Sequence, residues 1–310
     1  MKWLKFVKQK FIKTYKLIKH FIMKKIALIL NISIALLFVG CKQDSKTEST
    51  EKEVIVKQRN EPKKSSYHLE SAKDWLSKNA SDSTKFRIAY AVNRTDATNF
   101  KKMDSVVIPD DLTGDIEFYL PFPETVSALK DINKIVFFSY PTQTFAAYEK
   151  GELVYTGPTN MGREKDKTPT GLFFTNWKAE ETTSTFDDEW ELRWNFNIEN
   201  KLGVGWHQYT LPGYPASHSC LRLQEQDARK LYDWADQWEL SNPETVKVKG
   251  TPVIVFGNYD FKAPKPWLEL IKNPKALTIS ENEIENVAKP FVESIMKEQK
   301  IRQDFQKVAK

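Results

Sequence analysis

The spacing of apolar residues divides the chain into segments of different kinds. Residues 26–39 form an apolar run of 14 residues, which is shorter than the about 20 residues that a membrane-spanning helix needs. Residues 42–66 contain no aromatic side chain and are rich in Lys, Glu, Ser and Thr. Such a segment cannot bury enough apolar surface to fold, so residues 41–66 are predicted to be a flexible tether.

The folded part is predicted to begin with a small α/β module at residues 67–125. Apolar residues have helical spacing at 72–76 and again at 86–89, and residues 105–109 form an apolar strand that ends in Pro. The Asn-containing turn at 92–96, followed by this strand, weakly resembles a LysM module, a fold that binds glycan strands. A small cap packed on the next domain is the alternative interpretation.

Residues 133–260 are predicted to form a mainly β domain, because short β-type segments recur and turn residues are frequent between them. The segments that favour strands are 135–138, 144–148, 153–155, 171–177, 190–194 and 253–256. A hairpin turn is expected at 149–152. One helix is expected between Gln224 and Glu239, where the apolar residues follow helical spacing.

Residues 261–310 are predicted to be a C-terminal helical extension. Ser280 and Glu283 form a capping box, and the apolar residues that follow have helical spacing. A kink is expected at Pro290, because proline removes a helix hydrogen bond. The apolar stripe of this helix is expected to pack on the domain, and no chemistry is assigned to it.

The N-terminal segment resembles the signal of a bacterial lipoprotein. Two lysines follow Met23, the apolar run comes next, and residues 37–41 resemble a lipobox that ends at Cys41. The resemblance implies that Cys41 is diacylated and anchors the mature chain to a membrane. Phe38 departs from the usual leucine, and an ordinary secretory signal is the alternative.

The start and destination of the chain follow from the same segment. Residues 1–22 are basic and amphipathic, as in a helix on a membrane surface. Because Met23 alone would begin a complete signal, we expect it to be the true start and residues 1–40 to be the leader. Lys42 stands where an aspartate would indicate retention at the inner membrane. The expected location is therefore the outer membrane, facing the periplasm of a Gram-negative bacterium.

The charge balance argues against nucleic acid as a partner. Residues 1–40 contain nine lysines and no acidic residue, so the net charge of +6 becomes −3 for a chain that begins at Cys41. A mildly acidic mature chain lacks the basic footprint of nucleic-acid binding.

The candidate chemistry lies around Cys220, the second of only two cysteines. Two of the four histidines, His207 and His218, lie within thirteen residues of it. A nearby imidazole can take the thiol proton, and the N-terminus of a following helix would favour the thiolate. These groups suit acyl transfer through a thioester. A buried, inert cysteine is one alternative, and a zinc site made by the same three side chains is another.

Several motifs resemble the L,D-transpeptidase catalytic domain of the YkuD type. The core of that signature is an upstream His followed by Ser/Thr-His-Gly-Cys, an apolar residue and Arg or Asn, and it is matched by His207 and by residues 217–222. Further matching motifs lie at 160–162, 167–171, 227–232 and 250–253. The resemblance covers about residues 133–257, and its motifs occur in the family's order.

The resemblance implies a role for each motif residue. Cys220 would be the nucleophile and His207 its base, oriented by a backbone carbonyl near Gln208. The backbone N–H groups of Ser219 and Cys220 would form the oxyanion hole. The side chains expected to shape the loop or contact the substrate carboxylate are those of Ser217, His218 and Arg222.

The resemblance also implies an architecture and a reaction. It implies a β-sandwich with one or two flanking helices, which acts as a monomer on the stem peptides of peptidoglycan. No cofactor and no metal are expected, and carbapenems are expected to acylate the thiol. The implied product is a 3→3 crosslink, formed with release of D-alanine. An L,D-carboxypeptidase or hydrolase with the same site and a non-catalytic wall-binding lipoprotein are the alternatives.

One residue departs from the family signature. Ser219 stands where the family has glycine. If this position has a positive φ, a serine there is strained by about 1 kcal/mol or more.

Overall fold

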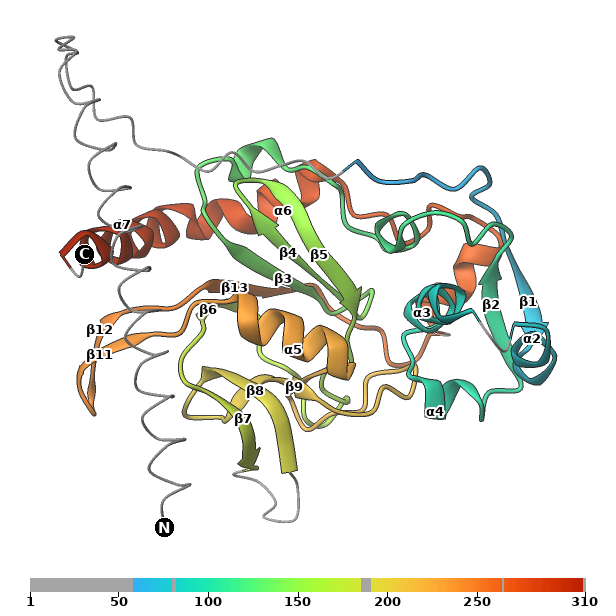
Figure 1. The fold of residues 1–310 in the computed structure, drawn as a ribbon, viewed down its shortest axis with the longest axis horizontal. Coiled ribbons are helices and arrows are strands. Elements are labelled where there is room, and N and C mark those ends of the chain that lie inside the picture. The colour runs from blue at the N-terminus through green and yellow to red at the C-terminus, as the bar shows by residue number, and fades with distance from the viewer. Residues whose placement is uncertain (1–57, 80–81, 185–190, 264, 309–310) are drawn as a thin grey trace, which may run out of the picture. The chain divides into compact units, whose positions relative to one another are not determined.

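The computed structural model describes residues 58–308, except 80–81, 185–190 and 264 (Figure 1). The predicted leader, its lipidation residue Cys41 and the first part of the predicted tether lie outside the described residues. None of the described helices has the length and apolar character needed to cross a bilayer.

The N-terminal module pairs its first and last strands. β1 (Tyr67–Ser71) and β2 (Ser105–Pro109) are antiparallel, and α2 (Ala72–Lys78), α3 (Ser83–Val92) and α4 (Ala97–Phe100) lie between them in sequence (Figure 1). Edge-to-face contacts between aromatic rings hold the core of the module together. The rings are those of Trp75, Phe86, Tyr90 and Phe100. The predicted α/β character of this region is confirmed.

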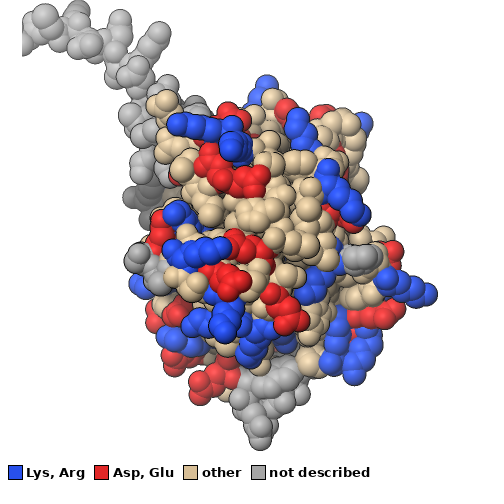
Figure 2. Space-filling model, turned by 90° about the vertical axis from the view of Figure 1, so that its right-hand side faces the viewer, with Lys and Arg blue, Asp and Glu red and all other residues tan. Residues whose placement is uncertain are grey.

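The face of the molecule on the side of this module carries charges of both signs. Figure 2 shows Lys and Arg side chains interspersed with Asp and Glu around an uncharged central area. A nucleic-acid site typically presents an extended surface of one sign. This face does not.

A five-stranded sheet forms the centre of the following domain. Its strands are β3 (Ile135–Ser139), β4 (Thr144–Glu149), β5 (Glu152–Pro158), β6 (Gly171–Phe174) and β13 (Pro252–Phe256), in the order β5-β4-β3-β13-β6. All neighbours are antiparallel except β3 and β13, which are parallel. The expected hairpin turn joins β4 to β5.

A four-stranded sheet packs against it. Its strands are β7 (Lys178–Thr183), β8 (Glu191–Glu199), β9 (Val204–Gln208) and β10 (Leu221–Leu223), in the order β10-β9-β8-β7. One apolar core contains side chains of both sheets and of helix α5 (Glu225–Trp234). The predicted β-sandwich is therefore confirmed.

The central strand β3 is covered on both faces, which explains its unbroken apolar sequence. Val136 and Phe138 face the core between the two sheets. Ile135 and Phe137 face a second core, which contains side chains of α6 (Glu281–Ala288) and α7 (Val292–Val308). The C-terminal extension is thus packed on the sheet, as expected.

The C-terminal helix begins and bends where the sequence predicts. The Ser280 hydroxyl accepts a hydrogen bond from the Glu283 N–H at 3.1 Å. A 3₁₀ turn at Lys289–Phe291, which contains Pro290, separates α6 from α7. Other 3₁₀ elements occur at Ile116–Tyr119, Ser127–Leu129 and Pro266–Ile271.

The helix predicted between Gln224 and Glu239 is shorter than expected. Helix α5 ends at Trp234 because Ala235 is extended (φ −77°, ψ 145°) and the Asp236 N–H donates to the Thr251 hydroxyl at 2.8 Å. Glu239 instead begins β11 (Glu239–Asn242), which forms a hairpin with β12 (Thr245–Val248). A long-range hydrogen bond therefore overrides the helical spacing.

The tether prediction is wrong for residues 59–66. The Arg59 guanidinium lies 2.9 Å from the Glu124 carboxylate and 3.3 Å from that of Glu117. The Lys63 N–H donates to Asp111 at 2.7 Å, and the Ser66 hydroxyl donates to Asp110. These contacts hold the segment on the folded part, because its polar residues find acidic partners that its composition did not reveal.

Candidate active site

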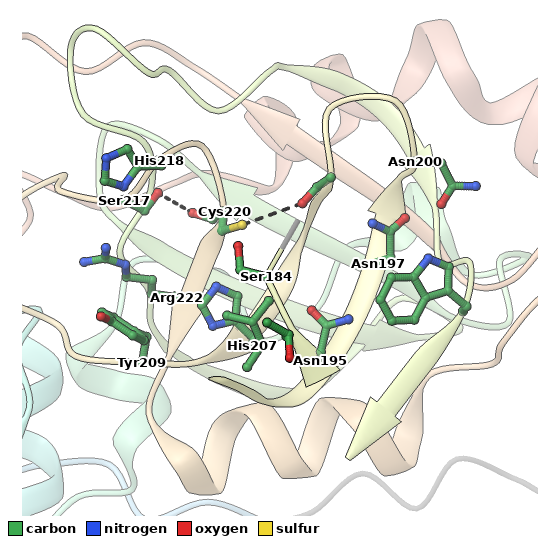
Figure 3. A pocket seen from close by; sticks show the side chains of 14 residues that line it. Ser184, Asn195, Asn197, Asn200, His207, Tyr209, Ser217, His218, Cys220 and Arg222 are labelled. Carbon is green, nitrogen blue, oxygen red and sulfur yellow. Dashed lines mark hydrogen bonds between the residues drawn. The ribbon is translucent and has the colours of Figure 1, made fainter. Parts of the chain in front are cut away.

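The two residues predicted to carry the chemistry lie on adjacent strands. His207 is in β9, and Cys220 directly precedes β10. The two strands are parallel, with Arg222 opposite His207 in the ladder. Figure 3 shows Cys220 and His207 at the same pocket. Pairing of the two strands therefore brings together side chains that are thirteen residues apart.

The pocket has a volume of about 270 Å³ and two chemically different ends. Tyr209, His218 and Arg222 lie to one side of Cys220, and asparagine side chains lie to the other (Figure 3). The described lining residues are Trp177, Thr183, Ser184, Leu192, Asn195, Asn197, Asn200, Gly203, His207, Tyr209, Ser217, His218, Cys220 and Arg222.

His207 is built as a neutral base. Its imidazole is 4% exposed, and burial lowers its pKa to about 4. Nδ1 lies 3.0 Å from the Gln208 carbonyl oxygen, which can only accept. Nδ1 therefore carries the proton, and Nε2 keeps a free lone pair. The backbone carbonyl predicted to orient this histidine is thus that of Gln208.

Cys220 is held as a thiol rather than a thiolate. Burial raises the pKa of its side chain, and the thiol donates to the Gly203 carbonyl at 3.8 Å. Figure 3 shows the sulfur directed toward that carbonyl. Attack with His207 as general base therefore requires the thiol to turn from Gly203 toward the imidazole.

The helix predicted after Cys220 is present, but a short strand lies between it and the cysteine. β10 (Leu221–Leu223) comes next, and α5 begins only at Glu225. The effect of a helix dipole falls off within about one turn. The N-terminus of α5 therefore does not explain any activation of Cys220.

Hydrogen bonds fix the backbone of the loop before Cys220. The Ser217 hydroxyl donates to the Cys220 carbonyl at 2.6 Å, and the Thr168 hydroxyl donates to the Ser219 carbonyl at 2.9 Å. The N–H groups of Ser219 and Cys220 donate to no acceptor among the described residues. Both remain available to bind an oxyanion.

Ser219 has a φ of 74°, in the left-handed region that favours glycine. Ser219, which replaces the glycine of the family signature, is therefore strained as the sequence analysis expected for a positive φ. Replacing the residue (Ser219→Gly) is expected to raise the free energy of unfolding by about 1 kcal/mol, because glycine has no Cβ to strain at this φ. Denaturant unfolding of the purified protein measures this change.

Ser219→Ala is the matched control, because it removes the hydroxyl and keeps the Cβ. It should not be more stable than the wild type. Equal stabilisation by both substitutions would mean that the hydroxyl, and not the backbone conformation, destabilises the loop.

The other motif side chains form the cationic end of the pocket. The Arg222 guanidinium lies 4.4 Å from the centre of the Tyr209 ring, a cation–π distance. His218 Nε2 lies 4.0 Å from the Asp166 carboxylate, which also pairs with Arg163. Arg222 is thus oriented by an aromatic ring and has no carboxylate partner among the described residues, so it suits a carboxylate of a ligand.

The N-terminal module holds the loop that links β9 to Cys220. The Thr95 hydroxyl donates to the Leu211 carbonyl at 2.9 Å, and the Leu211 N–H donates to the Asp96 carboxylate at 2.6 Å. Gln224 Nε2 donates to the Thr95 carbonyl at 2.8 Å. Sequence analysis placed Thr95 and Asp96 in a turn and missed this role, because no local pattern reports a contact 115 residues away.

One part of the chain matches a known protein family. Residues 133–255 match a family described as the YkuD L,D-transpeptidase catalytic domain. The match includes every predicted site residue of the pocket, from His207 to Arg222. None of the curated protein sequences is significantly similar to the chain.

Several solved structures are similar to about two fifths of the chain. An L,D-transpeptidase from Stackebrandtia nassauensis is 24% identical over 41% of this chain and 57% of its own, with a TM-score of 0.34. One from Mycobacterium smegmatis is 21% identical over 41% and 59%, with a TM-score of 0.32. One from Mycobacterium tuberculosis H37Rv is 20% identical over 41% and 58%, with a TM-score of 0.33. The chain therefore spans less than two thirds of the length of these proteins.

Proposed function

We propose that the protein crosslinks peptidoglycan through a thioester on Cys220, because residues 133–255 match the YkuD L,D-transpeptidase catalytic domain. The observation that carries the proposal is the parallel pairing of β9 and β10. It places a thiol and a neutral imidazole at one pocket. Stem peptides of peptidoglycan are the proposed substrates.

In the first step, Cys220 Sγ attacks the carbonyl between the third residue and the terminal D-alanine of a tetrapeptide stem. His207 Nε2 takes the thiol proton. The oxyanion is bound by the N–H groups of Ser219 and Cys220. When the C–N bond breaks, the imidazolium gives its proton to the leaving amine of D-alanine. The acyl group remains on sulfur as a thioester.

In the second step, the side-chain amine of a neighbouring stem attacks the thioester. His207 takes a proton from this amine and returns it to the departing sulfur, so the enzyme is restored. The product is a 3→3 crosslink. If water replaces the amine, the same residues give an L,D-carboxypeptidase, and the product is a tripeptide.

Incubation of the purified protein with tetrapeptide muropeptides tests the proposal. We expect crosslinked dimers and one free D-alanine for each crosslink, measured by mass spectrometry. If tripeptide forms without dimers, the reaction is hydrolysis and not transfer. If neither product forms, the enzymatic proposal fails, and a wall-binding lipoprotein whose module at 67–125 holds glycan is what remains.

The proposal includes a lipid anchor. Acylation of Cys41 would place the enzyme at the outer membrane, on the periplasmic side, within reach of the wall. The support is the lipoprotein-like signal at residues 23–41. A mature protein whose mass lacks a diacylglycerol on Cys41 would contradict this part alone.

A further inference from the structure

A β-bulge lies directly opposite the proposed base. Arg193 of β8 pairs with Gln208, and Phe196 pairs with Trp206. Trp194 and Asn195 therefore stand opposite the single residue His207. Bulges of this kind occur next to active sites, where they redirect a side chain.

The bulge decides which side chains of β8 face the pocket. Leu192 lines the pocket before the bulge, and Asn195 and Asn197 line it afterwards. If side chains alternated regularly along the strand from Leu192, position 194 would face the pocket and position 195 would face the opposite side of the sheet. The extra residue therefore puts an asparagine beside His207 where a tryptophan would have been (Figure 3).

The backbone of the bulge is strained and held by packing. Trp194 has a φ of 54°, which is unfavourable for a bulky side chain. Its ring lies 5.6 Å from the ring of Tyr232 and 5.1 Å from the Arg229 guanidinium, both on α5. Strain that the surrounding structure maintains in this way is typical of functional sites.

The Asn195 amide opens onto the pocket and makes no hydrogen bond to the described residues. Asn195 is 5% exposed, and no hydrogen bond of its side chain is found within the described residues. Its amide atoms are not among the fully enclosed polar atoms that lack a partner there, so they open onto the pocket that Asn195 lines. An amide that the protein leaves unpaired at a pocket can donate to and accept from a ligand. Its place at the pocket indicates that a ligand supplies the partner.

Asn197 lines the same pocket, and its side-chain amide is hydrogen-bonded within the protein. Its Oδ1 accepts from Asn176 Nδ2 at 3.0 Å, and its Nδ2 donates to the Glu199 carbonyl at 3.3 Å. Asn197 is 4% exposed and also lines the pocket. The two residues are therefore similar in burial and in position. Of the two, only Asn195 has a side-chain amide that is available to bind a ligand.

The chemistry of Asn195 selects a peptide unit. A carboxamide both donates and accepts, and a peptide unit offers one N–H and one C=O, whereas a carboxylate only accepts. Histidines apart, Arg222 is the one charged side chain of the described lining, and it lies on the other side of Cys220 (Figure 3). The two ends of the pocket thus suit a terminal carboxylate and an internal amide.

We propose that Asn195 binds the substrate through the peptide unit on the acyl side of the scissile bond. The terminal carboxylate then lies toward Arg222, and the scissile carbonyl lies between the two ends, at Cys220. This assignment rests on the proposed function, because it takes the substrate to be a stem peptide. It adds a residue to which no motif had pointed.

Binding to an inactive protein tests the assignment without turnover. In the Cys220→Ser background, calorimetry compares a tetrapeptide stem with an analogue in which an ester oxygen replaces the acyl-side N–H. We expect the ester to bind about tenfold more weakly than the peptide. With Asn195→Leu added, the peptide should bind about tenfold more weakly and the difference between the two ligands should disappear.

Asn197→Leu in the same background is the matched control. It should lower the melting temperature, because it breaks hydrogen bonds within the protein, and it should keep the preference for the peptide over the ester. Asn195→Leu should leave the melting temperature unchanged or raise it, because it breaks no hydrogen bond within the protein. This opposite effect on stability separates a ligand-binding amide from a structural one.

The outcomes separate this assignment from the proposed function. If the wild type turns over tetrapeptide but Asn195→Leu keeps the binding and the preference for the peptide, the assignment is wrong and the function stands. If the peptide binds as described and the wild type does not release D-alanine, the proposed function is wrong and the binding site stands. If no stem peptide binds the Cys220→Ser protein, both are overturned.

Discussion

The Cys220→Ser variant is expected to release D-alanine from tetrapeptide stems at least about 10⁴-fold more slowly than the wild type. A neutral imidazole can take a proton from a thiol far more readily than from a hydroxyl, which is a much weaker acid. The substitution changes little else, because the contact of the sulfur with Gly203 at 3.8 Å is weak. Release of D-alanine, followed by chromatography, measures the loss.

Carbapenem treatment gives a second readout of the same variant. The intact mass of the wild type should increase by one carbapenem, and the mass of Cys220→Ser should not change. Circular dichroism provides the control that the variant is folded. An adduct on Cys220→Ser, or D-alanine release at the wild-type rate, would show that another residue is the nucleophile.

The His207→Gln variant is expected to lose about 10²- to 10⁴-fold in kcat/KM, the usual contribution of a general base. Glutamine cannot accept a proton at neutral pH. His218→Gln is the matched control, since it removes the second imidazole of the pocket, and its loss should stay within about tenfold. Equal losses in both variants would mean that the sequence motif does not identify the base.

The pH profile of the wild type tests the state of His207 directly. Burial lowers the pKa of His207 to about 4, so the imidazole is neutral at higher pH and protonated at lower pH. Only the neutral form can take the thiol proton. We expect kcat/KM to hold down to about pH 5 and then to fall as the pH passes through 4. A fall centred near the ordinary pKa of histidine, about 6.5, would place the imidazole in water instead.

Sequence alone was informative wherever the structure depends on local patterns. The apolar run at 135–138 predicted strand β3, and the capping residues at Ser280 predicted the start of α6. The order of short motifs indicated the catalytic family. It also directed attention to Ser219, whose positive φ the structure then showed.

The remaining features depend on contacts between distant residues. The bulge at Trp194 breaks the alternation that strand prediction assumes, so Asn195 could not be assigned to a face. Residues 59–66 looked like a tether because their acidic partners lie some 45 to 65 residues further along the chain. The short strand β10, which precedes the predicted helix, was missed because it forms only beside β9.

The hydrogen bonds of Thr95 and Asp96 to the Leu211 backbone limit which mutations the loop can accept. These two bonds end on main-chain atoms, whose hydrogen-bonding groups survive the substitution of Leu211 by another residue. The loop can therefore accept new side chains for new substrates. An insertion in the turn at residues 92–96, or in the loop between β9 and Cys220, would break these hydrogen bonds. Related proteins that keep these hydrogen bonds should therefore differ in this loop by substitutions, and insertions and deletions should occur in other loops.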